Sequence, residues 1–105
     1  MPKNKMAQRV RVAVDAMGGD YAPEEIIKGA ILAAQKDNVE ISLVGSMNML
    51  EEELAKCKSC DNLPIHCVDA KEVIQESEPP ALAIRRKPDC SIAVATRLVK
   101  SSEAD

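Results

Sequence analysis

The chain alternates between short runs in which apolar and polar residues take turns and longer runs in which apolar residues recur every three or four positions. The first pattern is typical of β-strands, and the second places apolar side chains on one face of a helix. Strands are predicted at residues 10–14, 39–45 and 63–68. Helices are predicted at residues 23–36, 47–57, 79–87 and 90–99.

The predicted order is strand, helix, strand, helix, strand, helix, helix. Such alternation is typical of α/β proteins, in which helices join and cover the strands of a parallel sheet. We therefore expect an α/β fold with a mainly parallel sheet. A parallel sheet of three strands keeps open edges, and the last five residues follow a helix where the alternation predicts another strand. We accordingly expect the natural chain to continue beyond them.

The length of 105 residues suits one domain. Residues 1–8 are polar, without periodicity, and are predicted to be a disordered extension. The ordered domain is predicted to begin at residue 9 and to include the rest of the chain.

Composition argues against two classes of partner. The chain has 17 acidic and 14 basic residues, four of the latter within the first eleven positions, and it has one Tyr, no Phe and no Trp. It lacks the positive field and the stacking rings of most nucleic-acid binders, so we expect no nucleic acid as partner. No apolar run approaches the roughly 20 residues of a membrane helix, and no secretory signal is evident. These features predict a cytoplasmic protein.

A candidate binding loop follows the first predicted strand at residues 15–23 and contains Gly18 and Gly19. Ligands of open α/β sheets bind beyond the carboxyl ends of the strands, where this loop must lie. Adjacent glycines let backbone N–H groups point at an anion, and a helix beginning near Pro23 adds its positive end. Phosphate is therefore a candidate ligand, although a simple tight turn would need the same residues.

Charged residues complicate this hypothesis. Asp15 and Asp20 would repel a bare phosphate unless they bond loop N–H groups, turn away or face a donor on the substrate. Arg85, Arg86 and Lys87 end a predicted helix, where cations complement the helix dipole. One arginine could instead turn inward and pair with a phosphate or a carboxylate. The spacing leaves both readings open.

The four cysteines and the single histidine are candidates for metal or redox chemistry. Cys57 and Cys60 have the spacing of a zinc-ligand pair, but Cys67 and Cys90 do not repeat it. We therefore predict no metal site and expect the cysteines to be small hydrophobic residues that the cytoplasm keeps reduced, Cys57 on the apolar face of the second helix. His66 lies in a predicted edge strand without an evident nucleophile, which favours a structural role over a catalytic one.

The segment VRVAVDAMGGDYAP, at residues 10–23, closely resembles the amino terminus of the bacterial phosphate acyltransferase family of phospholipid synthesis, the PlsX family. Further similar segments are LVG at 43–45, EVI at 72–74, EP at 78–79, AIRRK at 83–87 and ATRLVK at 95–100. The resemblance extends from about residue 10 to Asp105. Members of the family are much longer, and their next strand, with a Ser-Ala-Gly-Asn-Thr-Gly type motif, would follow Asp105.

The resemblance implies transfer of a fatty acyl group from acyl carrier protein to inorganic phosphate. The product, an acyl phosphate, would serve a membrane-bound glycerol-3-phosphate acyltransferase. The family implies a three-layer α/β/α sandwich similar to isocitrate and isopropylmalate dehydrogenases, a homodimer, no cofactor, and a cytoplasmic location with association at the membrane surface. Residues 9–105 would be the amino-terminal part of a single acyltransferase domain.

The same resemblance implies a phosphate-binding set in which the glycines present backbone donors, the aspartates shape the loop and an arginine contacts the anion: Asp15, Gly18, Gly19, Asp20 and Arg86. Phosphate is itself the nucleophile, so no serine or cysteine of the chain has to form an acyl-enzyme. The catalytic residues are expected beyond Asp105, and residues 1–105 alone are expected to be inactive.

Two other classes of function stay open at this point. A non-catalytic anion-binding or interaction module could pair its exposed sheet edge with a partner chain. A small zinc domain would bind stoichiometric zinc and unfold with a chelator. Continuation of the natural polypeptide beyond Asp105 would favour the acyltransferase, and metal analysis would test the zinc domain.

Overall fold

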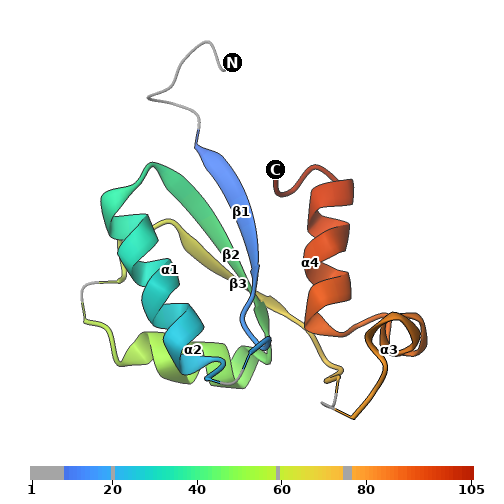
Figure 1. Cartoon of the computed structure of the whole chain (residues 1–105). Coiled ribbons are helices and arrows are strands. Elements are labelled where there is room, and N and C mark those ends of the chain that lie inside the picture. Colours follow the sequence, from blue (N-terminus) through green and yellow to red (C-terminus); the bar gives the residue numbers. More distant parts are fainter. Residues whose placement is uncertain (1–8, 20, 59, 75–76) are drawn as a thin grey trace.

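A computed structural model describes residues 9–19, 21–58, 60–74 and 77–105 of the chain (Figure 1). The predicted extension, residues 1–8, lies outside the described residues. The helices and strands follow one another in the predicted order: β1 (Val10–Asp15), α1 (Glu24–Lys36), β2 (Val39–Gly45), α2 (Met47–Ala55), β3 (Ile65–Asp69), α3 (Pro80–Arg86) and α4 (Ser91–Lys100).

The three strands form one parallel sheet in the order β1–β2–β3. Val12 of β1 lies opposite Ile41 of β2, and Leu43 of β2 lies opposite Cys67 of β3. The carboxyl ends of all three strands therefore meet at the same edge of the sheet. This arrangement confirms the prediction of an α/β fold with a parallel sheet.

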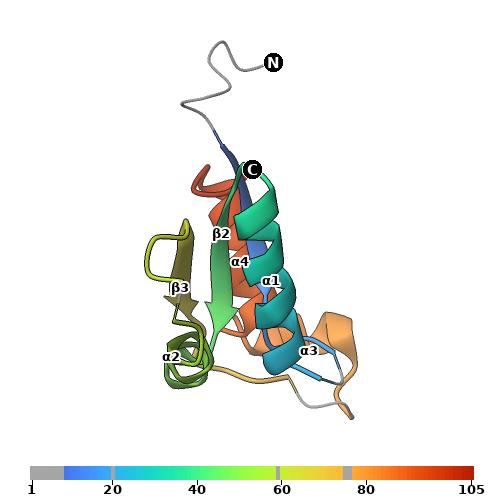
Figure 2. The same cartoon turned by 90° about the vertical axis from the view of Figure 1, so that its left-hand side faces the viewer.

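Helices cover both faces of the sheet (Figures 1 and 2). On one face, Ile27 of α1 and Leu50 of α2 are buried in one core cluster with Leu43 of β2. On the other face, Val94 of α4 is buried with Val44 of β2. Because side chains of a strand alternate between faces, β2 supplies both cores with neighbouring residues. No helix among the described residues is long and apolar enough to cross a membrane.

Two predicted boundaries differ by two residues from those in the structure, the others by at most one, and both lie next to the connection between α2 and β3. The helix ends at Ala55, so Cys57 follows α2 instead of lying on its apolar face. The strand begins at Ile65, two residues later than predicted, because the Leu63 N–H donates to the Cys60 carbonyl within a turn (3.0 Å) and Pro64 has no N–H to donate. Pro64 lies immediately before β3, which is an edge strand of the sheet.

The residues after α4 return to the outer edge of β1. The Asp105 N–H donates to the Arg11 carbonyl (2.7 Å), and the Arg11 N–H donates to Asp105 Oδ2 (2.8 Å). The Arg11 guanidinium also pairs with Asp105 Oδ1 (Nη2–Oδ1 3.1 Å). The side-chain hydrogen bond from Arg11, and after it the backbone one, hold the pKa of the Asp105 carboxyl below its ordinary value.

This pair predicts a pH-dependent attachment of Asp105 to β1. Because the pKa of Asp105 is lowered in the folded chain, the attachment is fully present above the ordinary aspartate pKa of about 3.9 and is lost as the pH falls through the lowered value. In an NMR titration of the side-chain carboxyl carbon, Asp105 should have a lower midpoint in the wild type than in an Arg11→Met variant.

A Lys28→Met variant is the matched control, because Lys28 pairs with Glu24 on the other side of the sheet and not with Asp105. Its Asp105 midpoint should equal that of the wild type. Equal midpoints in the wild type and the Arg11→Met variant would contradict the described pair.

Candidate functional site

The loop that follows β1 is held to the end of the sheet by its first residues. The Ala16 N–H donates to the Val44 carbonyl (2.9 Å), which extends the pairing of β1 with β2 by one residue. The Asp15 carboxylate accepts the Met17 N–H (Oδ1–N 3.0 Å). One of the three expected ways to accommodate an aspartate here, hydrogen bonding to a loop N–H group, is therefore confirmed for Asp15. Gly19 has a φ of +98°, which a residue with a side chain rarely adopts, so a glycine is required there.

A cavity of about 390 Å³ opens between this loop and the segments on either side of α3. Its lining comes from the end of β1, the loop, the segment before α3, and the first residues of α3 and α4: Asp15, Met17, Gly18, Gly19, Val73, Ile74, Glu78, Pro80, Ser91 and Ile92. In Figure 1 the start of α4 lies at the same end of the molecule as the carboxyl ends of the strands. The cavity thus occupies the place where α/β sheets bind ligands.

The helix that begins at this cavity is α4. Ser91 and Ile92 of its first turn line the cavity, and Ser91 is only 9% exposed. The first intrahelical bond runs from the Val94 N–H to the Cys90 carbonyl (3.0 Å), so the N–H groups of the three preceding helical residues have no partner within the helix. Cys90 occupies the N-cap position without a side-chain cap bond. Free N–H groups and the positive end of the helix dipole favour an anion at this position.

Asp89 lies one residue before the N-cap of α4 and does not cap the helix with its side chain. The Asp89 carboxylate pairs instead with Arg97, two turns further along the helix (Oδ1–Nη2 3.2 Å). Arg97 also donates to the Pro88 carbonyl through its other terminal nitrogen. These contacts draw the carboxylate toward the side of α4, which leaves the first turn to the cavity.

The three basic residues at the end of α3, Arg85, Arg86 and Lys87, differ in their exposure to solvent. Arg85 and Arg86 are exposed, whereas Lys87 is half-buried. The Lys87 ammonium donates to the Val73 carbonyl (2.6 Å) and pairs with the Glu78 carboxylate (2.5 Å). The sequence reading concerned an arginine, and both arginines are exposed; the basic residue that turns inward is Lys87, and its acceptor is a carboxylate of the chain.

The structure brings together three of the five residues predicted to bind phosphate. Asp15, Gly18 and Gly19 line the cavity, while Arg86 is not among its lining residues. Asp20 lies outside the described residues. The helical residues of the described lining belong to α3 and α4, and no residue of α1, the helix that sequence reasoning placed beside the anion, is among them.

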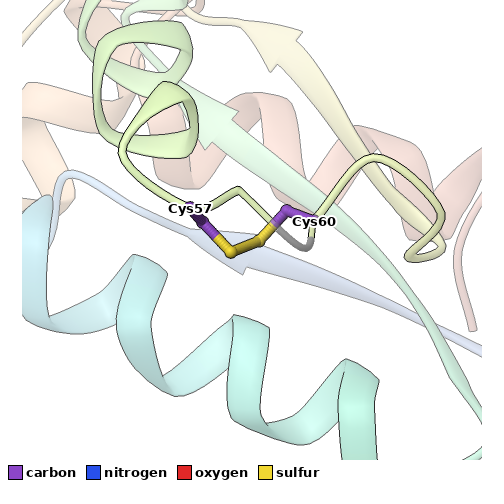
Figure 3. Close-up of a disulfide and its surroundings, with 2 residues drawn as sticks. All are labelled: Cys57 and Cys60. Carbon is purple, nitrogen blue, oxygen red and sulfur yellow. A yellow bond between two sulfur atoms is a disulfide. The ribbon is translucent and has the colours of Figure 1, made fainter.

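The cysteines do not form a metal site in the described part of the chain. Cys57 and Cys60 form a disulfide in the connection after α2 (Figure 3), which corrects the expectation that all four cysteines are reduced. Their Cα atoms lie 5.6 Å apart, within the range that a disulfide can bridge. Cys67 and Cys90 are free thiols, and burial raises the pKa of Cys67, with a smaller contribution from Glu51. No group of three or more potential metal ligands occurs among the described residues.

Gly45, at the end of β2, lies against the loop that follows β1. A Cβ atom placed on Gly45 would lie 2.8 Å from Met17 Cγ and 2.9 Å from its sulfur, closer than side chains tolerate. Gly45 therefore makes room for Met17, which is itself part of the cavity lining. The Ala70 N–H donates to the Gly45 carbonyl (2.8 Å), so the same glycine also joins β2 to the residue after β3.

The fold and the cavity define an α/β protein with a candidate ligand site at the carboxyl ends of its parallel strands. A protein-family model described as "Fatty acid synthesis protein" matches residues 10–105. The chain belongs to this family.

Three relatives, each described as a phosphate acyltransferase, illustrate the similarity. The protein of Picosynechococcus sp. is 46% identical over 97 residues, 92% of this chain and 27% of the relative. That of Moorella thermoacetica is 50% identical over 96 residues, 91% of this chain and 28% of the relative. That of Syntrophomonas wolfei is 52% identical over 97 residues, 91% of this chain and 30% of the relative. The chain thus spans less than a third of the length of these relatives.

The contact between Gly45 and Met17 predicts that a Gly45→Ala variant is less stable than the wild type. The added methyl group must displace the Met17 side chain, and overpacking of this kind costs about 1–3 kcal/mol of unfolding free energy. Chemical denaturation measures the loss. Resonances of Gly18 and Gly19 should shift as well, because Met17 adjoins them in the loop.

Gly29→Ala is the matched control. Gly29 lies inside α1, and a Cβ atom there would meet nothing within 4 Å. Alanine in a helix interior is favoured over glycine by roughly 0.5–1 kcal/mol, so this variant should be slightly more stable than the wild type. Equal stability of the two variants would contradict the close approach at Gly45.

Proposed function

We propose that the chain is the amino-terminal part of a phosphate acyltransferase domain. The domain would transfer a fatty acyl group from acyl carrier protein to inorganic phosphate in phospholipid synthesis. The match of the family model over residues 10–105 carries this proposal, and the names of the relatives indicate acyl transfer to phosphate. Because the chain spans less than a third of those relatives, the activity is proposed for the full-length protein, with catalytic residues beyond Asp105.

The proposed reaction requires phosphate to be held in line with the thioester. An oxygen of hydrogen phosphate attacks the thioester carbonyl carbon, and the carbon–sulfur bond breaks. The acyl phosphate leaves the enzyme, and the proton of hydrogen phosphate goes to the departing thiolate of the carrier protein. No cofactor takes part, so the first task of this region is to bind and orient an anion.

The cavity at the end of β1 suits this task. Gly18 and Gly19 can present backbone N–H groups from one side, and the first turn of α4 can present those of Ser91 and Ile92 from the other. The carboxylate of Asp15 is turned to the Met17 N–H, which reduces its repulsion of an anion. Asp20 and Arg86, the remaining residues of the predicted phosphate-binding set, remain candidates for contacts made in the full-length protein.

In the proposed full-length protein the three-stranded sheet is part of a larger α/β/α sandwich similar to isocitrate and isopropylmalate dehydrogenases. Two observations support a further strand beside β1. The backbone of Asp105 already bonds Arg11 at that edge (N–O 2.7 Å). Val10 and Val12 are 57% and 39% exposed there, which an added strand and its helix would cover.

The proposed partners follow from the same reaction. Acyl carrier protein and inorganic phosphate are the substrates, and a membrane-bound glycerol-3-phosphate acyltransferase would consume the product. The proposal includes a homodimer in the cytoplasm that associates with the membrane surface, because its product is passed to a membrane enzyme.

A non-catalytic module that binds an anion or a partner strand is the second candidate. The exposed valines of β1 favour it, since an open strand edge with apolar side chains can pair with another chain. It shares the phosphate-binding cavity with the acyltransferase and differs from it in having no turnover.

Phosphate binding is the first test of the site. Titration of the isotope-labelled chain with inorganic phosphate should give saturable NMR shifts at the Gly18, Gly19, Ser91 and Ile92 amides. A Ser91→Pro variant removes one N–H donor, and Cys90, with φ −73° and ψ 158°, already has the backbone conformation preferred before proline. Loss of a hydrogen bond to a charged group costs about 1.5–3 kcal/mol, so affinity should fall roughly tenfold or more.

Ser91→Ala is the matched control, because it removes the hydroxyl and keeps the N–H group. It should bind phosphate within about threefold of the wild type if the backbone donor is what matters. Shifts confined to the exposed face of α3, or equal loss in both variants, would contradict binding at the start of α4.

Turnover separates the two candidate functions. The full-length protein should form acyl phosphate from acyl carrier protein thioester and phosphate, whereas residues 1–105 alone should form none. Trapping of acyl phosphate with hydroxylamine measures the product. Phosphate binding without product from the full-length protein would favour the non-catalytic module, and product from residues 1–105 alone would contradict the placement of catalytic residues beyond Asp105.

A further inference from the structure

Lys87 connects two residues of the cavity wall. Its ammonium lies 2.6 Å from the Val73 carbonyl and 2.5 Å from Glu78 Oε1, and both Val73 and Glu78 line the cavity. The side chains of Lys87 and Glu78 are 28% and 25% exposed, so the pair is partly withdrawn from water. We call the lining residues Val73, Ile74 and Glu78 the cavity wall. One cation thereby bonds the first and the last residue of this wall.

Glu72, the residue directly before this wall, forms separate hydrogen bonds with Asp89, which precedes α4. The Glu72 N–H donates to the Asp89 carbonyl (3.1 Å), and the Asp89 N–H donates to the Glu72 carboxylate (3.0 Å). Glu72 also forms an isolated parallel bridge with Cys90. Lys87 adds bonds to Val73 and Glu78, the residues that line the cavity itself.

The same lysine changes the charge that the cavity presents. Two carboxylates, Asp15 and Glu78, are among the lining residues, and each would repel a phosphate dianion. Asp15 accepts a loop N–H group, and Glu78 faces the Lys87 ammonium. An ammonium at hydrogen-bond distance offsets most of the field of its carboxylate at longer range.

We propose that Lys87 is a positioning residue of the phosphate site. It acts through its bonds to Val73 and Glu78, which fix the cavity wall, and by offsetting the charge of Glu78, which lets an anion approach the first turn of α4. This inference rests on the proposed function, because that function supplies phosphate as the ligand.

Four variants of the chain test the proposal by titration with inorganic phosphate. Lys87→Met keeps the length of the side chain but removes the charge and the donors, and it should weaken phosphate binding about tenfold. Lys87→Arg keeps a cation that can donate to two acceptors and should restore most of the affinity. Lys36→Met removes the same charge from an exposed position in the last turn of α1 and should leave affinity unchanged.

The fourth variant distinguishes positioning from direct contact. In a Lys87→Met/Glu78→Gln chain neither the cation nor the carboxylate remains, so the charge repulsion is removed while the bond to Val73 is still missing, and affinity should recover in part, to a value above that of Lys87→Met. A lysine that touched phosphate itself could not be replaced in this way. Failure of the double variant to recover would overturn the positioning role.

Amide hydrogen exchange supplies a readout that does not depend on phosphate. The Glu72 and Asp89 amides should exchange about tenfold faster in Lys87→Met than in the wild type or in Lys87→Arg, because the wall loses its bond to Val73. If the wild-type chain binds no phosphate, the proposed phosphate site fails; faster exchange then still supports Lys87 as the residue that holds the wall. Unchanged exchange in Lys87→Met overturns the inference in either case.

Discussion

Parallel pairing of β1 with β2 is the constraint on which the candidate site depends. The register sets Asp15 opposite Val44, and the Ala16 N–H continues the pairing to the Val44 carbonyl (2.9 Å). Because the carboxyl ends of parallel strands lie at one edge of the sheet, the loop after β1 begins beside Gly45. The missing side chain of Gly45 leaves room there for Met17. A shift of one residue would turn every side chain of β1 to the opposite face and remove this support.

The site is then completed by contacts between segments that are distant in the sequence. The loop supplies one side of the cavity, and the first turn of α4 supplies another about 70 residues later in the chain. The hydrogen bonds of Lys87 and Glu72 hold the segment between β3 and α3 against the residues at the start of α4. An anion site that includes carboxylates in its lining needs such hydrogen bonds. Each carboxylate repels an anion unless a donor or a cation offsets its charge.

Much of the fold could be predicted from local patterns, and much of the site could not. Alternation and helical spacing gave the element order and the parallel sheet, and the glycine pair indicated a backbone conformation that Gly19 adopts (φ +98°). Which basic residue turns inward depends on where α3 stops: its last helical residue is Arg86, and the chain then directs Lys87 toward Glu78. A glutamate nine residues before a lysine was the available signal, but spacing across a helix end does not determine which side chains meet.

The meeting of the loop with the first turn of α4 at one anion site can be tested by crystallography with arsenate, a heavier analogue of phosphate that scatters X-rays anomalously. Crystals of the chain grown with arsenate should show an anomalous peak within hydrogen-bond distance of the N–H groups of Ser91 and Ile92, on the side that faces Gly18 and Gly19. A peak at another position at saturating arsenate, or none, would contradict an anion site between the loop and the first turn of α4.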